Sequence, residues 1–63
     1  MINYRGYTIN VFSIETGYAY TITQGSSLVY SSDAEFASYQ TAYEYAIADI
    51  DYILEVYINA LAA

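Results

Sequence analysis

Hydrophobic side chains recur at every second position in the first half of the chain, as in Tyr7-Thr8-Ile9-Asn10-Val11. A period of two, in residues that are mostly β-branched or aromatic, is typical of β-strands. Short glycine-containing segments at 14–17 and 24–27 interrupt the pattern, as hairpin connections do. We therefore expect three strands, at about 6–13, 18–23 and 28–31, arranged as an antiparallel meander.

The second half of the chain has the period of an α-helix. Ser38 is a suitable N-cap, and residues 39–61 contain neither glycine nor proline. The hydrophobic residues fall on one side of this helix, in a stripe roughly 160° wide. They are Tyr39, Ala42, Tyr43, Ala46, Ile47, Ile50, Ile53, Leu54, Tyr57, Ile58 and Leu61. The prediction is one α+β domain over residues 1–63, with a three-stranded β-meander packed on a single long helix at about 39–61 (βββα).

This helix is longer than the sheet that it would cover. It would measure roughly 34 Å, whereas three strands span about 10 Å between the outer pair. We expect its C-terminal part to extend beyond the sheet and to be available to a partner. The wide stripe has two interpretations: a core face with half-exposed borders, or borders that pack on a second copy of the chain.

The alternation also assigns the two faces of the sheet. The face toward the helix is predicted to hold Tyr7, Ile9, Val11, Tyr18, Tyr20, Ile22, Leu28 and Tyr30. The other face holds Thr8, Asn10, Phe12, Thr21 and Thr23, together with Ala19, Val29 and Ser31, and none of these is charged. Uncharged sheet faces and open edges favour association, so we expect a homo-oligomer, most simply a symmetric dimer, formed through the sheet, its edge or the overhanging helix.

Composition excludes most catalytic chemistry. The chain has no histidine or cysteine, and Arg5 is its only basic residue. Histidine bases, cysteine and lysine nucleophiles and zinc-binding thiolates are therefore absent. Asp51 and Glu55 share a helix face, but two carboxylates provide too few oxygens for calcium. We expect a protein that is not an enzyme and has no metal and no cofactor.

The sequence also lacks the features of membrane and secreted proteins. No run of eighteen apolar residues is present, and the first residues lack the apolar segment of a signal peptide. We therefore expect no membrane association and a cytoplasmic location, in the host cell if the protein is viral.

Seven acidic residues give the chain a net charge of -6. On the predicted helix, Glu44, Asp51 and Glu55 form a line along one flank, with spacings of about 10 and 6 Å. Asp33 and Glu35 precede the helix and could extend the line. Phosphates repeat along nucleic acid at comparable intervals. The line is either a solvated face or a binding surface for a basic protein, and direct nucleic-acid binding is not expected.

Tyrosine is the other unusual feature, with ten copies in 63 residues. Tyr45 and Tyr52 fall on the helix side opposite the core stripe, near Val56 and beside Asp49. Tyrosine is common at interfaces because it combines a large apolar area with a hydroxyl group. These four residues are either solvent-exposed singly or form an aromatic contact stripe.

Two resemblances bear on function. In its small size, acidity and lack of lysine, the chain resembles phage anti-restriction and anti-CRISPR proteins that imitate DNA, although it shares no motif with them. The segment Phe36-Ala37-Ser38, with Ala42, Ala46 and Ile50-Asp51, resembles HicB-like antitoxins, whose helix also follows a β-hairpin. The further strand and DNA-binding tail of that family are missing. The first hypothesis is therefore a phage-type acidic inhibitor of a basic site on another protein. The alternative is a self-assembling structural or antitoxin-like module.

Overall fold

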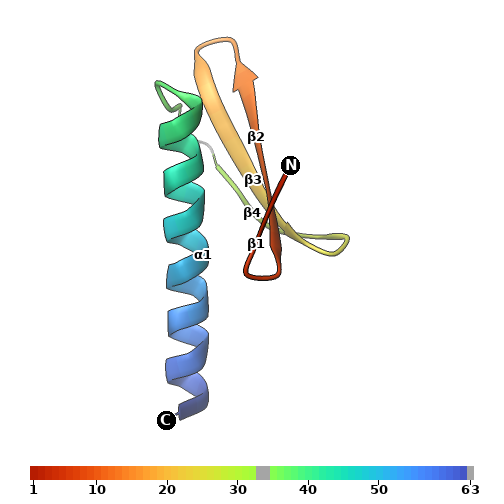
Figure 1. Cartoon of the computed structure of the whole chain (residues 1–63), viewed down its shortest axis with the longest axis vertical. Coiled ribbons are helices and arrows are strands. Elements are labelled where there is room, and N and C mark those ends of the chain that lie inside the picture. Colours follow the sequence, from red (N-terminus) through yellow and green to blue (C-terminus); the bar gives the residue numbers. More distant parts are fainter. Residues whose placement is uncertain (33–34, 63) are drawn as a thin grey trace.

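A computed structural model describes residues 1–32 and 35–62 of the chain. One antiparallel sheet contains β1 (Ile2–Tyr4), β2 (Tyr7–Ile14), β3 (Gly17–Gln24) and β4 (Ser27–Ser31), in that order. The helix α1 (Tyr39–Ala62) follows and packs on β2 and β3 (Figure 1). The predicted α+β class is confirmed, and the three expected strands correspond to β2, β3 and β4.

The fourth strand, β1, was not predicted. It is only three residues long, and it pairs with the start of β2 through Ile2↔Ile9 and Tyr4↔Tyr7. Arg5 and Gly6 form the connection, with φ angles of 50° and 89°. Two-residue hairpin loops favour positive φ at both positions, which usually selects Asn-Gly or a similar pair. Arginine is uncommon in this conformation, so the sequence carries no ordinary hairpin signal here.

The core lies between α1 and the two central strands. Ile9, Ile22 and Ile50 are fully buried and come from β2, β3 and α1. Ala42 and Ala46 are also fully buried, because their small side chains allow the first half of α1 to lie close to the sheet. This arrangement agrees with the predicted core face for Tyr7, Ile9, Tyr20 and Ile22.

The prediction was wrong for Leu28, which was assigned to the helix side of the sheet. A register shift at Ile22/Thr23 pairs Ile22 with Tyr30 but Thr23 with Leu28, so β4 carries one extra residue. Cross-strand partners share a face, so Leu28 lies with Thr23 on the face away from α1. Its exposed fraction is 63%. Tyr30 is about half exposed, because α1 covers β2 and β3 and leaves β4 at the uncovered edge.

The helix begins where the sequence predicts. The Thr41 amide donates to the Ser38 hydroxyl oxygen at 3.2 Å, and the Ala42 amide donates to the Ser38 carbonyl oxygen at 3.2 Å. The first bond satisfies an amide that has no partner within the helix, and the second is the first backbone hydrogen bond of the helix itself. Ser38 is therefore the N-cap of α1.

The far end of α1 extends beyond the sheet (Figure 1). The described part of the molecule is elongated, measuring 43 × 21 × 16 Å. Each residue from Glu55 to Leu61 is exposed. Within the described ranges, no helix has the combination of length and hydropathy needed to cross a membrane.

Candidate protein-binding surfaces

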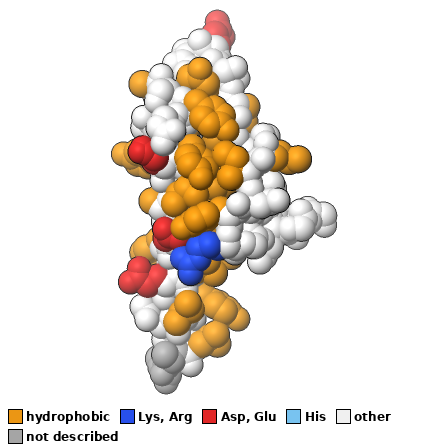
Figure 2. Space-filling model, in the orientation of Figure 1, with side chains coloured by type: hydrophobic (Ala, Val, Ile, Leu, Met, Phe, Trp, Pro, Cys, Tyr) orange, Lys and Arg blue, Asp and Glu red, His pale blue; other side chains and the backbone are white. Residues whose placement is uncertain are grey.

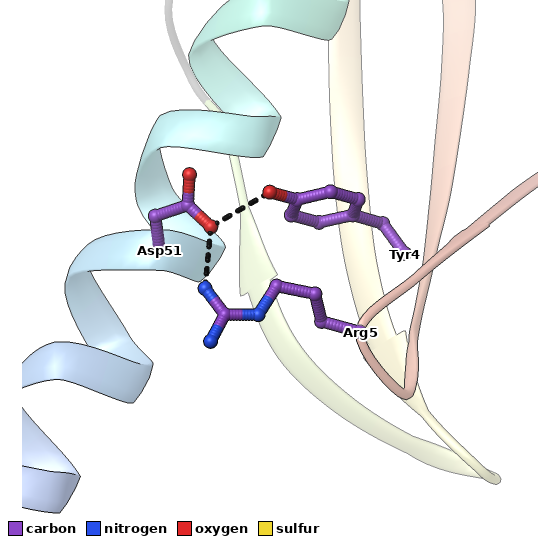
Figure 3. A network of polar contacts seen from close by, with 3 residues as sticks. All are labelled: Tyr4, Arg5 and Asp51. Atoms are coloured by element: carbon purple, nitrogen blue, oxygen red, sulfur yellow. Dashed lines mark hydrogen bonds and ion pairs between the residues drawn. The ribbon is translucent and has the colours of Figure 1, made fainter.

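A polar cluster joins the start of the chain to the middle of α1 (Figure 3). The Asp51 Oδ1 atom accepts a hydrogen bond from the Tyr4 hydroxyl at 2.8 Å and another from Arg5 Nη1 at 2.9 Å. The latter contact is also an ion pair, with both side chains roughly half exposed. Arg5 has a left-handed backbone conformation and lies in the tight turn between β1 and β2, from which its side chain reaches α1.

The cluster shifts the acidity of each of its members. The hydrogen bond from Tyr4, and then that from Arg5, hold the pKa of Asp51 below its usual value. The same carboxylate raises the pKa of Tyr4 and of Arg5, because both are stabilised in their protonated forms. Asp51 is therefore a carboxylate already engaged by two donors of its own chain.

This cluster changes the candidate acidic line. Glu44, Glu55 and Glu35 are exposed, as a binding role for them requires, whereas Asp51 is only partly exposed and is paired with Arg5. Asp33 lies outside the described residues. Two carboxylates of the line on the helix flank therefore face solvent, Glu44 and Glu55. Between them lies Asp51, whose charge is compensated by Arg5.

The candidate aromatic stripe lies along the opposite flank of α1. Tyr45, Tyr52 and Val56 are exposed by 56%, 69% and 48%. The Tyr45 ring rests on Phe36, with centroids 5.0 Å apart. Asp49 instead points to the sheet and accepts a hydrogen bond from the buried Tyr20 hydroxyl. Burial first, and this bond second, raise the pKa of Tyr20.

The candidate sheet surface is formed by one face of β2 and β3. The pairs Thr8↔Thr23 and Asn10↔Thr21 stand side by side, as does Phe12 with Ala19. The three threonines are half-buried, whereas Asn10 and Phe12 are exposed. Hydroxyl, amide and aromatic groups cover this face, and none of the residues in these pairs is charged.

A fourth surface lies at the far end of α1, and we call it the open end. It consists of Ile53, Leu54, Tyr57, Ile58 and Leu61. Tyr57, Ile58 and Leu61 are exposed by 60%, 55% and 70%, although they continue the stripe that is buried higher up the helix. Figure 2 shows hydrophobic side chains on this part of the molecule, beside the lower end of α1.

A groove adjoins the open end where α1 leaves the sheet. It has a volume of about 360 Å³ and is lined by Tyr7, Gln24, Ile53, Leu54 and Tyr57. Ile53, Leu54 and Tyr57 belong to the predicted core stripe and were not singled out as site residues, although the C-terminal part of the helix was expected to be available to a partner. The mismatch between helix length and sheet size predicted this overhang, but it did not indicate which residues would line a groove.

No group of three or more histidine, cysteine, aspartate or glutamate residues suited to a metal ion occurs among the residues that the structure describes. Comparisons with protein-family models, curated proteins and solved structures find no match to the chain.

Proposed function

We propose that the chain is a non-enzymatic protein-binding module that presents the open end of α1 to a protein partner. The observation that supports this is the continuation of the core stripe past the sheet. Three large apolar side chains there are each exposed by more than half, beside an apolar-lined groove. Contiguous exposed apolar surface is typical of protein interaction sites. The absence of histidine, cysteine and lysine from the sequence agrees with a non-enzymatic role.

Site-specific photo-crosslinking tests this proposal. A photoreactive phenylalanine analogue replaces Ile58 or Leu61 in protein produced in its own host cell. Irradiation is expected to give protein adducts from both positions, identified by mass spectrometry and then reproduced with purified components. A probe at exposed Gln40, near the start of α1, is the matched control and should give none. Adducts from Gln40 but not from the open end would contradict the proposal.

A second version of protein binding is inhibition of a basic nucleic-acid site, in the manner of a phage-encoded DNA mimic. The net charge of -6 and the exposed Glu44 and Glu55 favour it. A probe at exposed Ala48, on the outer side of α1, tests it within the same experiment. The expected adduct is a nucleic-acid-binding protein, whose affinity falls with added salt and with the double change Glu44→Gln and Glu55→Gln. Affinity that does not depend on salt would exclude this version.

A further inference from the structure

The apolar residues of the open end follow the spacing of helices that pair with other helices. Ile50, Leu54, Tyr57 and Leu61 are separated by four, three and four residues. Such alternating steps keep a seam on one side of a helix and are typical of coiled coils and helix bundles. The sheet covers the upper part of this seam, at Ile50, whereas Tyr57 and Leu61 remain 60% and 70% exposed. A second helix is therefore the matching occupant.

We infer that this occupant is the open end of a second copy of the same chain, packed antiparallel about a two-fold axis. The inference rests on the proposed function and names its partner. A parallel arrangement is excluded by geometry, because the sheet lies on the same side of α1 as the seam and two sheets would collide. In the antiparallel arrangement, each sheet lies beyond the end of the other helix.

The seam fixes the register of this dimer. With the axis between Tyr57 and Ile58, Leu54 lies opposite Leu61 of the second copy, and Tyr57 opposite the second copy's Ile58. The second copy's Leu61 then reaches the groove lined by Leu54, Tyr7 and Gln24. One contact thus covers both the exposed apolar residues and the groove of each copy.

The charges permit this contact although each chain carries -6. Between Leu54 and Leu61 the only charged residue is Glu55, which lies on the acidic flank at about 100° from Leu54. Glu44 and Asp51 lie further up the helix, outside the overlap. The two seams therefore meet without opposing carboxylates.

The available area is sufficient for a weak dimer. A whole tyrosine side chain offers about 200 Å² and a leucine or isoleucine about 100 Å². At their observed exposures, Tyr57, Ile58 and Leu61 provide roughly 250 Å² per copy. Since about 60% of an interface is apolar, two copies would bury roughly 800 Å². Ile53, Leu54 and the groove bring this close to the ~1,000 Å² expected of a specific interface.

The edge of the sheet is a poorer site for a second copy. β4 is uncharged and exposed, but it is five residues long and carries a bulge next to Thr23. Short strands and bulges both oppose edge-to-edge pairing.

Sedimentation equilibrium of the purified chain tests the inference over about 10 µM to about 1 mM, the range of weak association. The average mass is expected to rise toward twice that of the single chain. Leu61→Gln should weaken the dimer at least about tenfold. The matched control is Val56→Gln, which alters an exposed apolar residue of the same overhang but off the seam; it should change the dimer constant less than about twofold. A monomer at all concentrations, or greater loss from Val56→Gln, would overturn the inference.

Disulfide trapping tests the antiparallel register, since the chain has no cysteine of its own. A mixture of Leu54→Cys and Leu61→Cys chains should oxidise mainly to the mixed dimer, because these positions face each other. Predominant Leu61→Cys homodimers would contradict the register. If the pure chain is monomeric but the open end still crosslinks to another protein in cells, the inference fails while the proposed function stands.

Discussion

Asp51 is held by two donors from the first strand and its turn, and its charge therefore contributes to stability in a pH-dependent way. The pKa of Asp51 is lower in the folded chain than in the unfolded chain. Its contribution is present above the unfolded pKa, near 4, and is lost as the pH falls through the lower folded pKa.

We predict that Asp51→Asn lowers the melting temperature at pH 7 by more than it does at pH 2. At low pH the wild-type carboxyl is protonated and its ion pair with Arg5 is lost as well, so the two proteins converge. Melting curves followed by circular dichroism between pH 2 and 7 measure the difference. Glu44→Gln, which removes an exposed carboxylate from the same flank, is the control and should show a smaller difference at pH 7. A pH-independent effect of Asp51→Asn would contradict the prediction.

Single-residue chemistry was predictable only where it is local. Ser38 could be identified as the N-cap because its partner Thr41 lies three residues away. The contacts of Asp51 join positions 46 and 47 residues apart, and no spacing rule relates them. For the same reason, the bond between Tyr20 and Asp49 could not be inferred from the sequence.

Among the elements, the connector between β4 and α1 is anchored to the start of β3. Tyr18 and Phe36 exchange two backbone hydrogen bonds, each 2.9 Å long. Gly17 permits this contact, because a Cβ atom at that position would lie 2.6 Å from the Phe36 carbonyl oxygen. The approach of the connector to β3 therefore depends on the missing side chain.

We predict that Gly17→Ala destabilises the fold by about 1–3 kcal/mol, the usual cost of forcing atoms into filled space. Urea denaturation measures the loss, and hydrogen exchange should show weaker protection of the Tyr18 and Phe36 amides. Gly25→Ala is the control: its φ of +61° makes alanine unfavourable, but the position has open space around it. It should leave both amides protected. Unchanged protection in Gly17→Ala would show that the connector does not depend on this glycine.

The strong periodic signals located β2, β3, β4 and α1 to within one residue of their observed ends. β1 was missed because three residues cannot establish a period, and its Arg5-Gly6 turn lacks the common residues. The bulge in β4 could not be predicted, since it arises from the pairing of two strands rather than from either sequence. It also explains why Leu28 was assigned to the wrong face.

At the scale of the whole molecule, charge is strongly unbalanced. Seven acidic residues and one arginine share a structure whose longest dimension is 43 Å. At an ionic strength of about 0.01 M the screening length is about 30 Å, so carboxylates repel one another across much of the fold. This repulsion opposes the compact state.

We predict that raising the salt concentration from about 0.01 to about 0.1 M increases the melting temperature by a few degrees, because screening shortens to about 10 Å. Dilute protein should be used, so that association does not contribute. Glu44→Lys changes the net charge from -6 to -4 (-6 + 2) and should reduce the increase. A melting temperature that falls with salt would mean that the Arg5–Asp51 pair outweighs the general repulsion.

At position 5 the backbone conformation favours glycine, whereas the ion pair with Asp51 requires a cationic side chain. Its φ of 50° is one that glycine or asparagine adopts at lower cost, typically by about 1–2 kcal/mol for glycine. Arg5 nevertheless has the only cationic side chain in the sequence. Arg5→Gly would remove the ion pair, which lowers folding stability, and would relieve the left-handed backbone, which raises it. A substitution at position 5 would therefore change the electrostatic field of the protein at a smaller cost in folding stability than loss of the ion pair alone, because it relieves the backbone at the same time.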